Sequence, residues 1–443
     1  MTVLGATGSL LPVLSRFLKH WLASSQWHRT FRAILLATIA LPITSMATAG
    51  ELRPLLVVDG APMQAELVNL PAAGPWLVKD AAGAERDLPR DEIVSWGTPA
   101  ESALGPLVFL ADDGLLVQPP EPGQGPATVV FDKDRLHLDR SALGKLTLAL
   151  EDVRGVIFHP PADRHQRDLL ASRLFGDNAQ PPAEGERRDC DRVVLENGDE
   201  LDGTLESCDG RQVKIAVGAA NMTIEVAKVE AIVFNPSLLA PRQKMETGTI
   251  VGLADGSRIV ARRVELDGDT LRIVPRLADD DKSPWLASRA ALVFLQPLAG
   301  RVTYLSDLDA ESYKHLPYLS LAWPYHDDAN VSGLPLRAGG RLYAKGIGMH
   351  SAARLTYRLD KPYQRFEAEV AIDDETLARG SVTVRVFVDS QQRWASEIIR
   401  GGMPPVPVSV DIAGGKQFSL IVDFAERADE QDHVDWLDAR LIQ

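Results

Sequence analysis

A repeated pattern of short alternating segments between glycine turns most constrains how this chain can fold. Residues 193–234 show it best: apolar and polar residues alternate along each segment, and Asn-Gly or Asp-Gly pairs separate the segments. Period-two alternation indicates antiparallel strands with one buried face. Asn-Gly and Asp-Gly permit the positive φ angles that tight hairpin turns require. The pattern therefore predicts a compact antiparallel unit.

The same pattern occurs at residues 249–294, at 107–158 and, more weakly, at 55–96. In chain order, 36, 44, 36 and 38 positions separate the first turn glycine from the closing aromatic residue, which indicates four diverged copies of one unit. About five short strands in about 50 residues suit a small, strongly bent SH3-like or Sm-like barrel. Because a unit this small buries only a modest core, we expect the units to pair, sharing sheets or packing side by side.

The composition and the spacing of turns change near Arg301: aromatic residues become more frequent, and turn signals occur at irregular intervals. Many strands joined by longer loops are typical of a jelly-roll β-sandwich. The predicted fold is thus mostly β: four barrel repeats followed by a sandwich. The predicted division is a leader at 1–49, repeats at 50–98 and 105–160, a linker with a short helix (163–175) at 161–189, repeats at 190–236 and 246–298, and the sandwich at 300–443.

The first 49 residues contain the layout of a secretory signal. Arg29 and Arg32 precede an apolar run at 33–43, and Ala47-Thr48-Ala49 offers a small-x-small cleavage site before Gly50. The alternative is a transmembrane anchor, for which the run falls short of the ~20 residues that cross a bilayer. We therefore expect an exported protein, periplasmic or extracellular, with no membrane span after cleavage.

Two cysteines occur in the chain, and they flank the turn Asn197-Gly198-Asp199. In a hairpin centred on Asp199, Cys190 and Cys208 would lie opposite each other. An exported protein matures in an oxidising compartment, which favours a disulfide between them. The alternative is two free thiols.

Charge and motifs exclude several functional classes. The chain has a net charge of −14, whereas a protein that binds phosphate backbones usually carries a basic surface, so no nucleic-acid partner is expected. The chain has no G-x-S-x-G elbow, HExxH motif or P-loop, and no obvious scaffold to hold two carboxylates across a cleft. His159 and His165 near Asp163 lie in a polar linker and read as solvated rather than zinc-binding. We expect no catalysis.

Residues 304–443 resemble the NPCBM/NEW2 family, whose better-studied sugar-binding members are attached to glycoside hydrolases. The stretches that carry the resemblance are YLSDL at 304–308, LYAKGIGMHSAARLTYRL at 342–359, RFEAEVAIDDE at 365–375, GSVTVRVFVD at 380–389 and DHVDWLDARL at 432–441. The resemblance implies a galactose-binding-like β-sandwich and a glycan ligand. By analogy with the family, galactose-type sugars are the first ligands to test. Two positions depart from the family: Ser390-Gln391-Gln392 replaces the usual Asp-Gly turn, and Ala371 replaces a usual Gly.

Sugar recognition combines an aromatic face for the C–H groups of the ring with charged or amide groups for its hydroxyls. The candidate residues are Trp323, Tyr325, His350, Asp373, Asp432 and His433. Each has a structural alternative: loop packing for the aromatics, a buried turn-fixing role for His350, and caps or salt links for the acids. The acids also allow a structural Ca²⁺, which takes oxygen ligands; no other cofactor is expected.

We expect Trp323, Tyr325, His350 and Asp373 to converge on one exposed rim of the sandwich. Two functional hypotheses follow. The first is an exported, non-catalytic carbohydrate-binding protein of the cell envelope. The second is a structural or assembly protein whose sandwich and repeats bind other proteins, envelope proteins among them.

Overall fold

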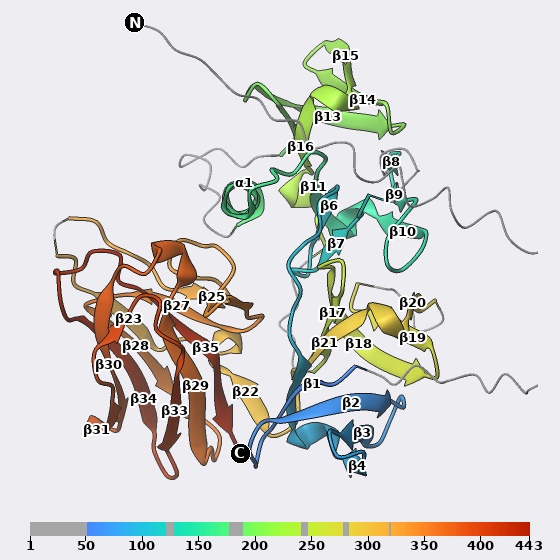
Figure 1. Ribbon diagram of the computed structural model, residues 1–443. Helices are drawn as coiled ribbons and strands as arrows, with labels where there is room; N and C mark the ends of the chain where they lie inside the picture. The colour runs from blue at the N-terminus through green and yellow to red at the C-terminus, as the bar shows by residue number, and fades with distance from the viewer. Residues whose placement is uncertain (1–50, 121–127, 177–188, 241–246, 278–282, 319) are drawn as a thin grey trace, which may run out of the picture. The chain divides into compact units, whose positions relative to one another are not determined.

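The computed structural model describes residues 51–120, 128–176, 189–240, 247–277, 283–318 and 320–443 (Figure 1). The fold is mostly β, as predicted, with one α-helix among the described residues. The predicted leader at 1–49 lies outside them. No helix in the described part of the chain is long and apolar enough to cross a bilayer.

The front half, residues 53–297, contains four successive groups of short strands joined by antiparallel pairing. The first group holds β1 (Arg53–Val57), β2 (Met63–Asn69), β3 (Trp76–Asp80), β4 (Glu85–Leu88) and β5 (Ile93–Gly97). The second holds β6 (Leu107–Leu110), β7 (Leu115–Val117), β8 (Val129–Phe131), β9 (Arg135–Leu138), β10 (Leu146–Ala149) and β11 (Val153–Ile157). The third holds β12 (Asp191–Leu195), β13 (Glu200–Cys208), β14 (Gln212–Val217), β15 (Ala220–Glu225) and β16 (Val229–Val233). The fourth holds β17 (Thr249–Leu253), β18 (Arg258–Asp267), β19 (Thr270–Pro275), β20 (Trp285–Ser288) and β21 (Leu292–Pro297).

Each group closes in the same way. A 3₁₀ turn precedes its last strand: η1 (Arg90–Glu92), η2 (Leu150–Asp152), η3 (Val226–Lys228) and η5 (Arg289–Ala291). The last strand then pairs antiparallel with the first strand of its own group. Because side chains alternate across a strand, one face of each strand fills the interior, as in β9, where exposed and buried residues alternate. A further short 3₁₀ turn, η4, spans Pro236–Leu238.

The closing strands also join the groups in two pairs. β5 pairs with β21, which links the first group to the fourth, and β11 pairs with β16, which links the second to the third. Gly97 sits at the first junction with φ +80, and a Cβ there would lie 1.9 Å from the Val293 carbonyl oxygen. The groups therefore share sheet hydrogen bonds, one of the two arrangements expected.

The helix expected over 163–175 is present as α1 (Arg164–Phe175). Asp163 caps it, because its side chain accepts a hydrogen bond from the Gln166 backbone N–H at 2.9 Å. The helix ends on Phe175, whose ring stacks on Phe109 of β6 with centroids 4.4 Å apart. This contact fixes α1 against the second group.

The predicted bond between Cys190 and Cys208 is wrong: the two residues are not bonded. The register pairs Asp191 with Gly203, so the hairpin is centred two residues earlier than the cysteine spacing requires. Cys208 instead lies far along β13, buried and opposite Phe131 of β8, where its thiol donates to the Val129 carbonyl. Burial raises the pKa of the Cys208 thiol to about 11. The hairpin centre on Asp199 that the spacing suggested was therefore wrong, and so was the cysteine pairing.

Residues 302–442 form two facing antiparallel sheets. One contains β22 (Val302–Tyr304), β24 (His326–Asp327), β27 (Gly346–His350), β29 (Arg365–Ile372), β33 (Val406–Asp411) and β35 (His433–Ile442). The other contains β23 (Ser312–His315), β28 (Ala353–Arg358), β30 (Ser381–Val388), β31 (Gln391–Ala395), β32 (Ile399–Arg400) and β34 (Gln417–Phe424). A small hairpin, β25 (Arg337–Ala338) and β26 (Arg341–Leu342), and two 3₁₀ turns, η6 (Leu305–Asp307) and η7 (Asp374–Thr376), complete the domain.

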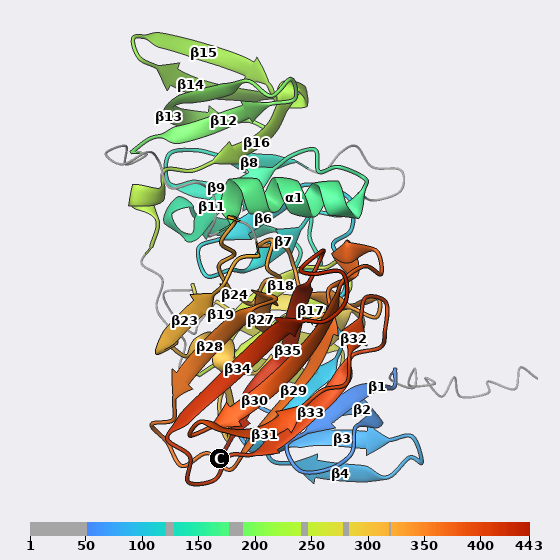
Figure 2. The same cartoon turned by 90° about the vertical axis from the view of Figure 1, so that its left-hand side faces the viewer.

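The core between these sheets is apolar and continuous, with Phe366, Phe418 and Trp436 at its centre. Figure 2 shows β34 lying between β28 and β30, as the pairing requires. The last strand begins at His433, so it includes residues 433–438 as well as the apolar run at 439–442. As a result, Asp435 lies inside a buried strand rather than in the loop before it.

Candidate functional site

One end of the sandwich gathers the candidate residues. β27, β29 and β34 end there, and β28, β30 and β35 begin there, so the connecting loops meet. Trp323, His350, His433 and Glu375 come together in this place, and we call them the Trp–His cluster.

Trp323 and His350 form the aromatic part of the cluster. Their rings are parallel within 1°, with centroids 4.9 Å apart, and the His433 ring lies 5.4 Å from Trp323 and 5.6 Å from His350. The Trp323 backbone N–H donates to His315 Nδ1 at 3.2 Å, and its carbonyl accepts from Tyr313 Oη at 2.8 Å. Trp323 is half-buried, so its loop is held on both sides while part of the residue stays accessible.

His433 and Glu375 form the polar part of the cluster. His433 Nδ1 lies 2.5 Å from Glu375 Oε1, which also accepts from Ser332 Oγ at 2.8 Å. Burial alone would raise the pKa of Glu375, but hydrogen bonds from His433 and Ser332 outweigh it and hold that pKa below its usual value. Glu375 is therefore a fixed carboxylate at neutral pH.

His350 is buried, at 3% exposure, so the expected exposed rim is wrong for this residue. It ends β27, a strand whose five residues are all buried because it runs between β24 and β35. Burial, with a smaller contribution from His433, lowers the pKa of His350 to about 4. The imidazole is neutral at physiological pH and serves as a flat support for Trp323.

Asp373 is also buried, at 2% exposure, which corrects its expected place on the rim. Its carboxylate caps η7 by accepting from the Glu375 N–H at 2.8 Å, and it accepts from the Arg337 N–H at 3.1 Å. Burial, followed by the nearby Asp373 carboxyl, raises the pKa of Asp435 well above its usual value. Asp373 thus fixes the loop that carries Glu375.

Asp432, the residue before β35, and His433, its first residue, are both buried. Asp432 accepts from the Ser381 N–H at 2.8 Å, and burial raises its pKa to about 6. Asp432 therefore connects β35 to β30, whereas His433 joins the Trp–His cluster. Tyr325 packs beside Tyr313, with ring centroids 5.1 Å apart, and against the sandwich core.

Among the described residues, no group of three or more His, Cys, Asp or Glu side chains could hold a metal ion. Asp373 and Asp432 accept backbone N–H groups instead. The structure therefore supports structural caps for these two acids, the alternative left open above.

Three members of the site were not predicted: Glu375, Ser332 and His315. Glu375 has a local signal, since it follows Asp373 by two residues and an Asp in that position commonly caps a turn. Ser332 and His315 have none, because each reaches the site only through the packing of distant strands.

Exposed large apolar side chains surround the same end of the sandwich. Those with the most exposed surface among the described residues of the domain are Leu316, Tyr318, Leu321, Leu377, Met403 and Phe424. Tyr318 meets Phe424 edge-on, with centroids 6.3 Å apart. Grouped apolar surface of this kind marks a contact site more often than isolated residues do.

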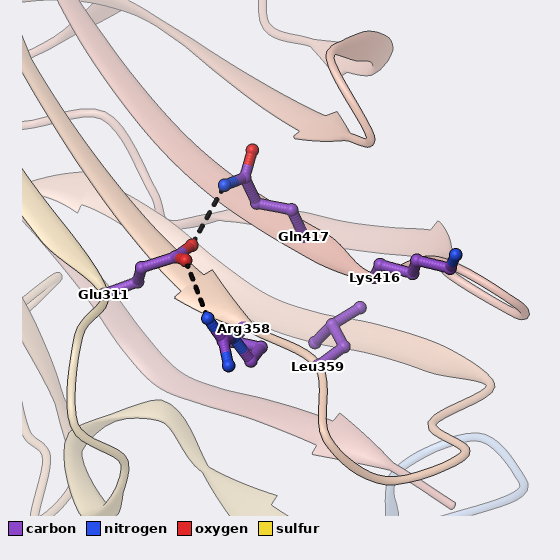
Figure 3. Close-up of a pocket in the computed structure, with 5 residues that line it drawn as sticks. All are labelled: Glu311, Arg358, Leu359, Lys416 and Gln417. Atoms are coloured by element: carbon purple, nitrogen blue, oxygen red, sulfur yellow. Dashed lines mark hydrogen bonds and ion pairs between the residues drawn. The ribbon is translucent and has the colours of Figure 1, made fainter.

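Two hollows lie away from the Trp–His cluster. One, of about 400 Å³, is at the opposite end of β28 and β34, where Glu311 accepts from Gln417 at 2.9 Å and from Arg358 (Figure 3). The other, of about 670 Å³, lies between the second and third strand groups, beside Phe158 and Arg211. Neither contains a predicted site residue.

Comparison with known proteins assigns the sandwich. The NPCBM/NEW2 domain model matches residues 301–442. A protein of Renibacterium salmoninarum named for endo-α-N-acetylgalactosaminidase activity is 28% identical over 116 residues, which are 26% of this chain and 8% of that protein. Alpha-1,3-galactosidase B of Akkermansia muciniphila is 32% identical over 115 residues, 25% of this chain and 14% of that enzyme. The chain thus matches only a small part of either relative.

Solved structures with similarity include a CBM51 module from Clostridium perfringens GH95 in complex with methyl-galactose. It is 28% identical with a TM-score of 0.29, over 32% of this chain and 99% of that one. Another contains CBM51-2 with GlcNAc and INT domains of Clostridium perfringens ZmpB, 24% identical with a TM-score of 0.30, over 41% of this chain and 40% of that one. With the family model spanning both sheets of the sandwich, residues 301–442 are an NPCBM/NEW2 domain.

Proposed function

We propose that this protein is an exported, non-catalytic glycan-binding protein of the cell envelope. Its sandwich would hold one sugar at the Trp–His cluster. The four strand groups would be small SH3-like barrels that carry the sandwich or dock other envelope proteins.

The observation that carries this proposal is the parallel Trp323–His350 pair beside the fixed Glu375 carboxylate, within a domain of a carbohydrate-binding family. A half-buried indole supplies a face for the C–H groups of a sugar ring. A carboxylate already held by His433 and Ser332 supplies a strong acceptor for a hydroxyl. Both are preorganised, so little side-chain freedom is lost on binding.

Galactose-type sugars are the proposed ligands. Both curated relatives are named for enzymes that act on galactose-type residues, N-acetylgalactosaminide and α-1,3-galactoside. A single ring on one aromatic face should bind weakly, at about −4 to −6 kcal/mol, which corresponds to millimolar to high-micromolar affinity.

The test is a titration of residues 50–443 with methyl α-galactoside and with N-acetylgalactosamine, in which calorimetry or NMR measures the binding. Trp323→Ala should weaken binding by at least tenfold, because it removes the ring that faces the sugar. Its melting temperature should fall by only a few degrees, since Trp323 is half-buried.

Trp394→Ala provides a matched control. Trp394 is also half-buried in the same domain, but it lies on the edge strand β31 opposite Val386. Its replacement should leave sugar affinity unchanged. Equal losses in both variants, or no binding of any glycan on an array by the unaltered protein, would favour the protein-binding alternative.

A further inference from the structure

Arg337 joins the sandwich to the front half through its side chain. The buried guanidinium donates to both Glu101 carboxylate oxygens, each at 2.8 Å, and to Asp168 of α1 at 2.7 Å. A bidentate Arg–carboxylate interaction fixes the relative orientation of the two groups as well as the distance between them. The β25–β26 hairpin, which begins at Arg337, is therefore tied to the segment after β5 and to α1.

The same hairpin holds η7 through backbone groups. The Arg337 N–H donates to Asp373 at 3.1 Å, and the N–H groups of Gly339 and Gly340 donate to the two oxygens of Asp374 at 3.1 and 2.8 Å. Both glycines have positive φ, which lets their N–H groups turn toward one carboxylate. The hairpin and η7 thus form one hydrogen-bonded piece.

From η7 the contacts continue into the Trp–His cluster. Asp373 accepts from the Glu375 N–H at 2.8 Å, and Glu375 holds His433 at 2.5 Å. The Asp373 N–H also donates to the His433 carbonyl at 2.9 Å. An unbroken path of hydrogen bonds therefore runs from Glu101 and Asp168 to His433.

We infer that Arg337 is a positioning residue for the glycan site and that the front half sets the affinity of the sandwich through it. Arg337 does not touch the proposed sugar position. It holds the β25–β26 hairpin, the hairpin holds η7, and η7 aims Glu375. This inference rests on the proposed function of the Trp–His cluster.

Binding and docking are then linked in both directions, since coupling between two sites is reciprocal. When the Arg337 contacts form, Glu375 is held in the geometry that a sugar hydroxyl needs. When a sugar occupies the site, η7 and the hairpin are held in turn. A protein that bound at Glu101 or α1 would change glycan affinity without contacting the glycan.

The test compares Arg337→Met with Arg365→Met in residues 50–443. Arg365 also joins the sandwich to the front half, through the Val58 carbonyl and Asp59, but it lies at the far end of β29 from η7. Arg337→Met should lower methyl α-galactoside affinity about three- to tenfold, and Arg365→Met should leave it within twofold. Glu101→Gln is the milder second variant if Arg337→Met does not fold.

A double-mutant cycle separates positioning from general destabilisation. In a Glu375→Gln background, Arg337→Met should produce no further loss of affinity if it acts through Glu375. Hydrogen exchange of residues 373–377 should be faster in Arg337→Met and unchanged in Arg365→Met. Additive losses in the cycle, or equal effects of both arginine variants, would overturn the inference.

The two proposals fail separately. If the unaltered protein binds no sugar, the proposed function is lost, and hydrogen exchange at 373–377 alone decides whether Arg337 holds η7. If it binds sugar and Arg337→Met binds equally well, the positioning role is overturned while the function stands.

Discussion

His350 belongs to the Trp–His cluster, and Asp432 precedes its member His433 in the chain. Both residues are buried, and their shifted pKa values have opposite effects on how stability changes with pH. The pKa of His350 falls to about 4, and that of Asp432 rises to about 6, in both cases chiefly because of burial. Unfolding returns each group to its ordinary value. The folded state therefore resists protonation at His350 and favours it at Asp432.

Acid should destabilise the protein through His350. Its folded pKa lies below its unfolded value, so between about pH 6.5 and 4 the unfolded state binds the extra proton, and stability falls as pH falls. From pH 7 to 5 this group alone should remove about 2 kcal/mol. His350→Phe keeps a ring against Trp323 and cannot be protonated, so its melting temperature should drop less over that range than that of the unaltered protein.

Asp432 contributes the opposite slope, since its folded pKa is raised and its stabilisation is lost as pH rises through about 6. Asp432 is present in both the unaltered protein and His350→Phe, so the difference between their changes in melting temperature with pH reports His350 alone. Parallel pH curves for the two proteins would show that His350 is already charged or accessible in the folded state.

The closing strands are the elements on which the front half depends. At the β5–β21 junction, Gly97 opposes Phe294, and the chain comes too close there for any side chain. Gly198, in the β12–β13 turn, has a similar φ of +86 but nothing within 4 Å of a would-be Cβ. The two glycines share a backbone conformation and differ in crowding.

Gly97→Ala and Gly198→Ala should therefore differ widely in stability. Each should cost about 1 kcal/mol for placing Ala at positive φ. Gly97→Ala should cost a further ~2 kcal/mol or more, because the strands must separate to admit the methyl group. Urea unfolding measures both; similar losses in the two variants would mean that β5 and β21 are not paired.

Elements follow from local pattern, whereas register and burial do not. Alternation in RFEAEVAI predicts β29 correctly, since period two is a property of a single strand. The Cys190–Cys208 pairing failed because register depends on which residues the partner strand presents. Asp373 and His350 failed as rim residues because neighbouring strands, distant in sequence, cover them.

At the scale of the whole molecule, the sandwich has its own core and also makes side-chain contacts with the front half. Tyr304 is buried with Val58 and Val94, and its hydroxyl accepts from Gln296 at 2.9 Å. Arg337 and Arg301 form ion pairs with Glu101 and Asp59. The family resemblance predicted the domain but not these contacts, because they depend on side chains outside it.

A fragment of residues 301–443 should fold, because the core between its two sheets is complete. It should melt roughly 5 °C or more below the full chain, since Tyr304 and Arg337 lose their partners. Far-UV circular dichroism and thermal unfolding of the fragment check this. An unfolded fragment would show that the sandwich does not fold by itself. A melting temperature equal to that of the full chain would show that the contacts with the front half do not stabilise the sandwich.

The nested pairing of the strand groups bears on how the chain reaches its native state. The second and third groups are neighbours in sequence, but β5 must wait for β21, which is made about two hundred residues later. Until then its outer edge offers unsatisfied N–H and C=O groups to any other strand. Distant closures of this kind are slow and leave nascent chains open to aggregation. A chain interrupted before β21 would therefore be a hazard to its neighbours and a natural client for chaperones.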